Sequence, residues 1–458
     1  MTEEELVITI DDINKLFEIG KIVGKGAYGL VKQVIAISTI KIKKGIKEII
    51  INKGKSYAAK IIKSTEKKEY IKTLFREYTI LQRLDHENII KVYALYFSKN
   101  DNNYYLIMEL LEQTLLSYLK KKDIELDEKI DIMIGILNGV QYLHTKPFPN
   151  LENRFIVHFD LKEDNIMIEI CDNKISKLKI IDFGISRIMN EGIYLSERRS
   201  GTIPYMAPEL LCLILKKEER EACGPEYINE FYGKLVDMWS CGVIFFTMLL
   251  KNLPFGENPV TVFVNVFKYA KDPMNYIFGK TADGEAITLP YIELKFDFLI
   301  GELMQKLLEP KAYDEDDEDE IRWNAYNAIK HCQTIKESMN VIIIDKKLTM
   351  YNNNNNGNIY GQLLLEKERR IDAQRKYDRN ELKRFGDDFG GEHNEHKLLY
   401  ESSDDARKCR IVQEIHDKIY FYCSHILDKK TLFQHLVQNA VSMQQKKQYP
   451  LCYLCPNQ

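Results

Sequence analysis

The sequence carries little net charge, few cysteines and no long apolar run. Its formal charge is −3 at pH 7 over 458 residues, so the chain as a whole has no bulk attraction to nucleic acid or to a membrane surface. Its nine cysteines are scattered and odd in number, which is typical of a reducing compartment rather than of a disulfide framework. The longest apolar run, Met238 to Leu250, is too short to span a bilayer.

The first residues of the sequence do not have the pattern of a secretory signal peptide. Met1-Thr2-Glu3-Glu4-Glu5 is acidic and lacks the basic and apolar regions of a signal peptide. We therefore expect a cytoplasmic protein, with the nucleus as the open alternative, no membrane span and no nucleic-acid partner. What the sequence does have is a 45% share of hydrophobic residues, which predicts a sizeable core and argues against wholesale disorder.

An octapeptide near the middle of the chain concentrates polar side chains. His158-Phe159-Asp160-Leu161-Lys162-Glu163-Asp164-Asn165 lies between two apolar runs that predict strands, 155–157 and 166–168. Asp can accept a proton, Lys can neutralise phosphate charge, and Asn can hold a metal ion through its carbonyl oxygen. Taken alone, such a loop is more often simply solvated. A second polar motif, Asp182-Phe183-Gly184, follows another predicted strand at 178–181.

Glycines mark a second candidate phosphate site near the start of the chain. Gly24-Lys25-Gly26-Ala27-Tyr28-Gly29 lies between two strand-like stretches, 17–23 and 31–37. The spacing G-x-G-x-x-G is shared by dinucleotide-binding folds, which place a helix directly after it, and by protein kinases. Because a strand follows here, the pattern favours a hairpin whose glycines let the backbone approach phosphates.

One lysine and one glutamate occupy apolar surroundings. Lys60 lies inside the predicted strand 57–62, and Glu77 shares the apolar stripe of a predicted helix. The stripe consists of Ile71, Leu74, Phe75, Tyr78, Leu81 and Leu84. A carboxylate on an apolar face calls for a cation, and we predict that Lys60 supplies it.

These motifs together resemble those of the eukaryotic protein kinases of the serine/threonine type. Three later stretches match the family in the same order. Gly201–Glu209 resembles the end of the activation segment. Asp237–Gly242 resembles the start of the buried helix that anchors the catalytic loop. Arg322–Ala325 resembles the last helix, whose arginine would pair with Glu209. The stretch Leu249–Phe255 looks most similar to the calmodulin-dependent-like group.

The resemblance implies an α+β fold of two lobes. A small β-rich N-terminal lobe would span 17–108, a hinge 109–112 and a large helical C-terminal lobe 113–332. An N-terminal extension would occupy 1–16. The tail, 333–458, is expected to be mostly helical or partly disordered. Its role stays open between a segment that binds a regulator or the kinase domain itself and a low-complexity extension without a selected function.

The resemblance also implies ATP and Mg²⁺ as cofactors. Asp160 would act as the base and Lys162 would neutralise the transferred group, while the Lys60–Glu77 pair would grip the other phosphates. Asn165 and Asp182 would hold magnesium. The nucleotide would be bound by Val23, Gly24, Lys25, Gly26, Ala27, Tyr28, Gly29, Leu30, Val31, Ala58, Lys60, Met108, Glu109, Leu111 and Met167.

The implied function is transfer of the γ-phosphoryl group of Mg-ATP to serine or threonine hydroxyls of proteins, in a signalling role. Lys162 and Thr202 match the serine/threonine pattern, and the acidic Asp164 favours substrates with nearby basic residues. The alternative is a pseudokinase-type scaffold that binds partners without catalysis. Such scaffolds commonly lose one member of a set that this chain retains in full: Lys60, Glu77, Asp160, Asn165 and Asp182.

Two features depart from the family pattern. Phe159 stands where most regulated kinases have an arginine that pairs with an activation-loop phosphate, so we predict that this chain does not depend on that switch in the usual way. The stretch 38–55 is rich in Lys and Ile and predicts an inserted hairpin. Its lysines fit a solvated strand face better than a nucleic-acid patch, because interleaved aromatic residues are missing.

Overall fold

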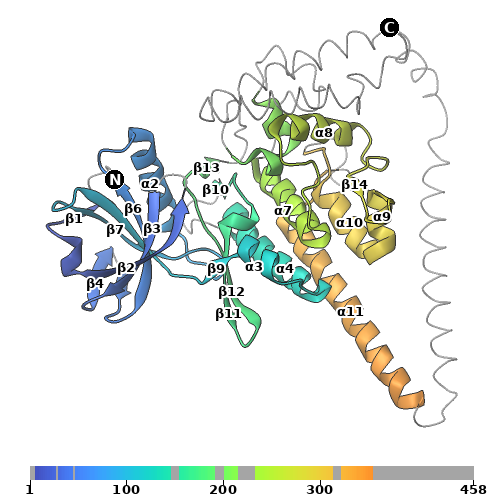
Figure 1. The fold of residues 1–458 in the computed structure, drawn as a ribbon, viewed down its shortest axis with the longest axis horizontal. Coiled ribbons are helices and arrows are strands. Elements are labelled where there is room, and N and C mark those ends of the chain that lie inside the picture. The colour runs from blue at the N-terminus through green and yellow to red at the C-terminus, as the bar shows by residue number, and fades with distance from the viewer. Residues whose placement is uncertain are drawn as a thin grey trace, which may run out of the picture. The chain divides into compact units, whose positions relative to one another are not determined.

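The computed structural model describes residues 6–26, 29–44, 47–145, 154–190, 201–214, 233–312 and 321–353. The chain divides into two units, Met1–Ile335 and Lys336–Gln458, and both lobes lie in the first (Figure 1). Ala27 and Tyr28 of the glycine-rich loop, and the tail after Asn353, lie outside the described residues. The predictions made for them therefore stay predictions.

Six strands form one sheet in the N-terminal lobe, in the order β1-β7-β8-β6-β3-β2. All neighbours are antiparallel except β1, which runs parallel to β7. The strands are β1 (Ile8–Ile10), β2 (Phe17–Gly26), β3 (Gly29–Ala36), β6 (Ser56–Lys63), β7 (Val92–Ser98) and β8 (Asn103–Met108). The glycine-rich loop thus joins two paired strands with no helix after it, as predicted, and Gly24 lies opposite Val31.

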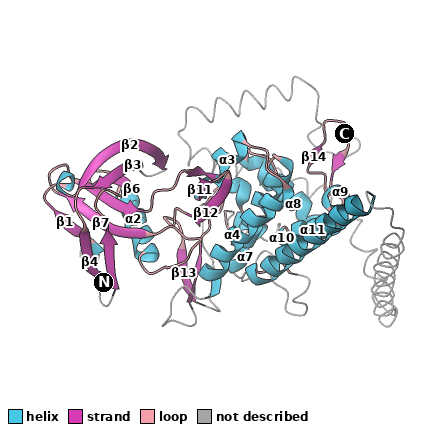
Figure 2. Cartoon of the chain, turned by 90° about the horizontal axis from the view of Figure 1, so that it is seen from below, coloured by secondary structure: helices cyan, strands magenta, loops and turns pink. Residues whose placement is uncertain are grey.

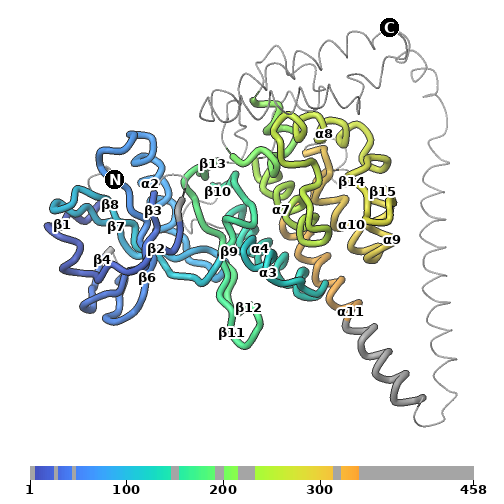
Figure 3. Tube along the Cα trace, viewed as in Figure 1, coloured from blue at the N-terminus to red at the C-terminus, as the bar shows by residue number. Residues whose placement is uncertain are grey.

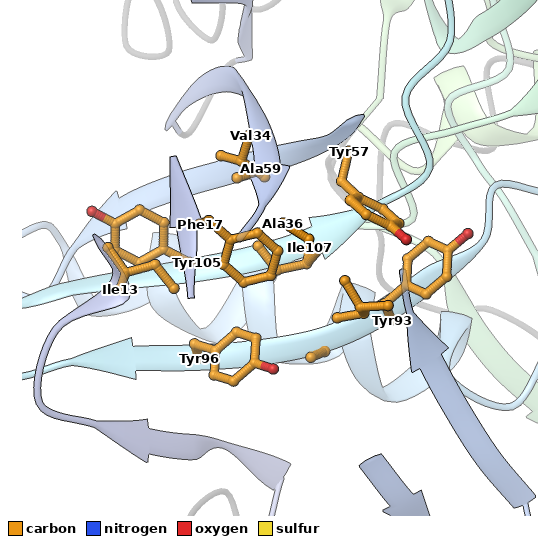
Figure 4. Packing of buried hydrophobic residues seen from close by; sticks show 12 residues of the cluster. Ile13, Phe17, Val34, Ala36, Tyr57, Ala59, Tyr93, Tyr96, Tyr105 and Ile107 are labelled. Carbon is orange, nitrogen blue, oxygen red and sulfur yellow. The ribbon is translucent and has the colours of Figure 1, made fainter. Parts of the chain in front are cut away.

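The sheet presents two different faces. On one face Tyr57 and Ala59 of β6 join a buried apolar cluster in which the rings of Tyr57 and Tyr93 meet edge to face at 5.0 Å (Figure 4). Because side chains alternate along a strand, Lys60 points to the opposite face. Helix α2 (Lys68–Leu81) lies there and buries the predicted stripe, although it ends before Leu84, the last position expected to be helical.

The inserted hairpin covers the apolar cluster. Strands β4 (Ile40–Lys44) and β5 (Lys47–Ile51) pair antiparallel, as predicted. Ile40, Ile42, Ile49 and Ile51 join the cluster or pack against it, while Lys41, Lys43 and Ile50 are exposed. The lysines therefore lie on the solvated face of the hairpin. β1 and the short 3-10 helix η1 (Ile13–Lys15) also contribute to the cluster.

The C-terminal lobe is mostly helical (Figure 2). Its helices are α3 (Leu115–Lys121), α4 (Leu126–Thr145), α5 (Pro208–Cys212), α7 (Gly233–Leu250), α8 (Pro259–Lys271), α9 (Leu289–Phe296), α10 (Phe298–Leu307) and α11 (Ala325–Asn353), with short 3-10 helices η2 (Glu163–Asn165) and η3 (Ile203–Tyr205). Its strands are β9 (Gln113–Thr114), β10 (Arg154–Val157), β11 (Ile166–Cys171), β12 (Lys174–Ile180), β13 (Arg187–Asn190), β14 (Gly279–Lys280) and β15 (Ala286–Ile287). Figure 3 follows the chain from the sheet of the N-terminal lobe into these helices.

Helix α7 forms the centre of the C-terminal lobe. It is the one helix of the described ranges that is long and apolar enough, by composition, to cross a membrane, but 83% of it is buried inside the protein. Its Trp239 stacks on Phe255 with ring centroids 5.4 Å apart. A Cβ atom on Gly242 would lie 2.8 Å from a methyl of Leu308, so glycine lets α7 approach the end of α10 closely. Burial in the lobe therefore accounts for its apolar sequence.

Candidate active site

The carboxylate of Asp160 is held by three donors. Lys162 Nζ lies 2.9 Å from Oδ2, Asn165 Nδ2 donates to the same oxygen at 2.9 Å, and Thr202 Oγ1 donates to Oδ1 at 2.6 Å. Lys162 also donates to Thr202 Oγ1 at 2.7 Å. The side chains come from the polar octapeptide and from the stretch before η3, and together they fix the direction of the Asp160 carboxylate.

Asp237 of α7 anchors the backbone before Asp160. Its carboxylate accepts the backbone N–H groups of His158 at 2.8 Å and Phe159 at 2.9 Å, and its Oδ2 lies 3.0 Å from Nε2 of His144. Phe159 has a φ of 69°, a region that non-glycine residues adopt only when the surroundings impose it. The fully buried Asp237 provides that constraint, and α7 is thus the anchor that the sequence predicted.

Lys60 connects the N-terminal lobe to the Asp-Phe-Gly motif. Its Nζ lies 2.6 Å from Oε2 of Glu77 and 3.6 Å from Oδ1 of Asp182. Burial opposes a charged amine, but the two carboxylates outweigh it and raise the pKa of Lys60. The predicted Lys60–Glu77 pair is therefore present and carries a fixed positive charge toward Asp182.

Asp182 lies beside Asn165, and both present oxygen atoms. The backbone N–H of Ile181 donates to the carbonyl of Asn165 at 2.9 Å, which joins the two segments. Asp182 itself has a φ of 61°. Burial disfavours its charge, yet Lys60, His158 and the N–H of Gly184 together hold the pKa of Asp182 below its usual value. The site thus contains an ionised carboxylate on a segment whose backbone is hydrogen-bonded to Asn165.

The strand register brings the predicted nucleotide-binding residues together. Val31 pairs with both Gly24 and Lys60, and Ala58 pairs with Met108 at the end of β8. The chain then leaves the sheet, and Leu111, a residue that is 5% exposed, has no hydrogen-bond partner for its backbone N–H among the described residues. An unpaired buried donor is suited to a ligand.

The remaining predicted residues lie around this arrangement. The N–H of Glu112 donates to the carbonyl of Ile168 at 3.2 Å, which places the segment after β8 against β11 and its Met167. Lys25 and Gly26 continue β2, and Leu30 pairs with Ile61 in β6. Val23 is also part of β2, where 42% of its side chain is exposed.

Sequence reasoning missed the role of Lys179. Its Nζ donates to the carbonyls of Glu87 and Ile89, and lies 3.3 Å from Oε2 of Glu109. Lys179 thereby ties the segment after β8 to the strand before the Asp-Phe-Gly motif. A lysine inside the apolar run 178–181 was the available signal, the same one that singled out Lys60.

Sequence reasoning also missed the burial of Glu163. The sequence suggested only another polar residue of the octapeptide, but Glu163 is 1% exposed and accepts a hydrogen bond of 2.5 Å from the hydroxyl of Tyr205. Burial raises the pKa of Glu163, and the Tyr205 hydroxyl opposes that shift. The Tyr205 carbonyl in turn accepts from Ser240 of α7 at 2.8 Å. Glu163 therefore joins the polar octapeptide to η3.

Removal of the Tyr205 hydroxyl tests this connection. Tyr205→Phe is expected to lower the free energy of unfolding by about 1–3 kcal/mol, because a buried acceptor loses its donor. Urea denaturation measures the change. Tyr326→Phe, whose ring is 61% exposed, is the control and should stay within about 0.5 kcal/mol of the parent. Equal stability of the two variants would contradict a structural role for the bond.

Comparisons with known proteins agree with this geometry. The family "Protein kinase domain" matches residues 17–275. Serine/threonine-protein kinase tousled-like 1-B of Danio rerio is 36% identical over 203 residues, which cover 42% of this chain and 24% of that protein. Serine/threonine-protein kinase RAD53 of Saccharomyces cerevisiae is 30% identical over 260 residues, covering 56% of this chain and 28% of RAD53.

A plant protein is also similar to this chain in sequence. The SNF1-related protein kinase catalytic subunit alpha KIN12 of Arabidopsis thaliana is 30% identical over 263 residues, covering 56% of this chain and 43% of that protein. The matched region is thus less than half the length of each of these relatives. They do not specifically support the calmodulin-dependent-like group suggested by the sequence. The family match covers more than half of the chain, and the chain therefore belongs to the protein kinase family, in which its relatives are serine/threonine kinases.

Proposed function

We propose that this chain transfers the γ-phosphoryl group of ATP to serine or threonine hydroxyls of protein substrates. The observation that carries the proposal is the closed triangle of Asp160, Lys162 and Thr202, with distances of 2.9, 2.7 and 2.6 Å. The triangle holds a proton acceptor, Asp160, beside a cation, Lys162. Catalysis of phosphoryl transfer consists mainly of positioning and charge neutralisation. Membership in the family supports the use of ATP.

The adenine base is proposed to bind at the segment after β8. The unpaired N–H of Leu111 would donate to a ring nitrogen, and the carbonyl of Glu109, which also has no partner among the described residues, would accept from the amino group. Ala58 and Met108 face each other in register and would bound the base together with Met167 and Ile181.

Magnesium is proposed to bind at Asn165 and Asp182. Their side chains offer oxygen atoms, which Mg²⁺ prefers, and the depressed pKa of Asp182 keeps its carboxylate ionised. In the described part of the chain no three His, Cys, Asp or Glu side chains gather around one point. Water and phosphate oxygens would therefore complete the coordination, and the ion would supply charge neutralisation when bound.

The protein's own groups would then divide the work. Asp160 would orient the substrate hydroxyl and accept its proton, and Lys162 would face the transferred phosphoryl group. Lys60, kept charged by Glu77 and Asp182, would bind the other phosphates. The exposed carboxylate of Asp164 would favour substrates with basic residues near the modified hydroxyl.

The direct test is transfer of radiolabelled phosphate from Mg-ATP to a generic basic protein, followed by phosphoamino-acid analysis. Label on serine or threonine is the expected result. Label on tyrosine alone would contradict the substrate class. Absence of transfer with ATP binding intact would favour the pseudokinase-type scaffold, unless removal of residues after Asn353 restores activity.

Lys60→Met tests the nucleotide side of the proposal. Loss of the buried amine removes a charge that faces the phosphates, and kcat/KM is expected to fall by about 10²–10³-fold. Lys63→Met is the matched control, because Lys63 lies on the same strand but is exposed. Steady-state kinetics with varied ATP measures both. Parallel losses in the two variants would show that Lys60 has no special role.

The phenylalanine at position 159 predicts how the transfer rate responds to phosphorylation of the activation segment. Its side chain is 4% exposed and uncharged, so it offers no cation to a phosphate on the activation segment. Ser196→Ala together with Ser200→Ala is therefore expected to leave the transfer rate within about twofold, because no phosphate pairing by this position is lost. Both serines lie outside the described residues. Collapse of activity in the double variant would overturn the prediction.

A further inference from the structure

A cationic pocket lies outside the site described above. It has a volume of about 450 Å³ and lies between α2 and β13. Its lining includes four basic residues, Lys72, Arg76, Arg83 and Arg187, and no acidic residue. Apart from Thr79 and Ser186, the rest of the wall consists of apolar side chains, among them Leu6 near the start of the chain. The pocket is therefore suited to an anionic segment with an apolar neighbour.

The four cations are not neutralised within the described part of the chain. None of them forms an ion pair with a described carboxylate. Arg76 donates instead to the carbonyl of Gly184 at 3.1 Å, and Arg187 to the carbonyls of Ile185 and Ser186. The pKa of Arg187 is lowered by burial and by the neighbouring Arg76.

The sequence of α2 brings like charges close together. Lys72 and Arg76 are four residues apart on one helix, and like charges at this spacing repel each other. Three of the four cations come from α2 or from the residues directly after it, and the fourth comes from β13. An anion between them would relieve both the repulsion along α2 and the repulsion between α2 and β13.

The chain itself leads an acidic segment to this pocket. β1 pairs with β7, and β7 packs against α2, so the residues before β1 start close to α2. Leu6 is 9% exposed and lines the pocket. Glu3, Glu4 and Glu5 directly precede it, and three residues of extended chain reach about 10 Å. The carboxylates are thus within reach of the four cations.

We propose that the acidic segment Glu3–Glu5 docks in this cationic pocket and bridges α2 to β13. Leu6 is its apolar anchor, and the carboxylates pair with the cations of both elements. α2 carries Glu77, and β13 follows the Asp-Phe-Gly motif that Arg76 contacts. The docked segment therefore stabilises the position of α2 against the segment that contains Asp182.

Hydrogen exchange on the full chain tests the proposal without reference to catalysis. The variant Glu3→Lys/Glu4→Lys/Glu5→Lys should exchange the amide hydrogens of residues 72–83 about 3- to 10-fold faster than the parent, since exposed ion pairs are individually weak. The opposite change, Lys72→Glu/Arg83→Glu, should act in the same direction. Combining the two sets should restore most of the protection, because the charges are again complementary.

A matched control separates pairing from net charge. Lys41→Glu/Lys43→Glu makes the same charge change on the exposed face of the β4–β5 hairpin, and it should not restore protection to the Glu3–Glu5 variant. Equal rescue by this control, or unchanged exchange in the first variant, would overturn the proposal. The phosphorylation of Ser196 and Ser200 is measured in parallel by mass spectrometry. If the protection of residues 72–83 depends instead on phosphorylation of Ser196 and Ser200, a phosphoryl group occupies the pocket. That result would also overturn the proposal.

Discussion

Asp160→Ala should reduce phosphoryl transfer by about 10²–10⁴-fold, the usual contribution of a general base. The carboxylate that Lys162, Asn165 and Thr202 hold in one orientation is lost, while the residues proposed to bind the nucleotide stay in place. The affinity for ATP should therefore change much less than the rate. Radiolabel transfer measures the rate, and equilibrium binding of ATP measures the affinity.

The control for this prediction is an exposed aspartate. Asp283→Ala removes a carboxylate from the loop between β14 and β15, and its transfer rate should match that of the parent. A rate for Asp160→Ala within about tenfold of the parent would contradict the role of Asp160 as the base. The rate enhancement would then come from the positioning of the substrates by the remaining residues.

Arg322→Met should destabilise the C-terminal lobe by about 3–5 kcal/mol, because it leaves a buried carboxylate without its partner. Arg322 and Glu209 form two hydrogen bonds, at 2.7 and 3.2 Å, and their side chains are 0% and 2% exposed. The guanidinium also donates to the carbonyls of Leu235, Glu309 and Pro310. Urea denaturation of the full chain measures the effect.

An exposed ion pair provides the comparison. Lys177 and Glu169 lie 2.7 Å apart, as close as Arg322 and Glu209, but their side chains are 46% and 39% exposed. Lys177→Met should therefore cost less than about 1 kcal/mol. Similar losses for Arg322→Met and Lys177→Met would show that burial of the Arg322–Glu209 pair does not determine its contribution.

Periodicity and local composition were sufficient for the elements near the site. Strand-like runs on both sides of the glycines predicted the β2–β3 hairpin, and the apolar stripe around Glu77 predicted α2. These patterns are local, because a strand repeats every two residues and a helix every 3.6. The end of α2 was overestimated at Leu84, since an apolar residue can continue a pattern beyond the last helical turn.

Other features depended on segments far apart in the sequence. Nothing local distinguishes Ile8–Ile10, whose three residues form a strand only because β7 offers an edge for pairing. The octapeptide concentrates polar residues, and nothing in it singles out Glu163, which is buried because Tyr205, 42 residues later, supplies its donor. The register of the sheet and the packing of α7 bring such residues together, and neither follows from a local pattern.

The sequence by itself determined the type of fold, the order of the motifs and the residues able to carry charge, because each of these depends on residue type and short spacing. The tertiary structure decided which of the charges meet. Lys60 finds Glu77 and Asp182, and Asp160 finds Thr202, whereas Arg76 and Arg187 meet each other without a described carboxylate. Coulomb energies depend on distance and burial, and both quantities exist only once the chain has folded.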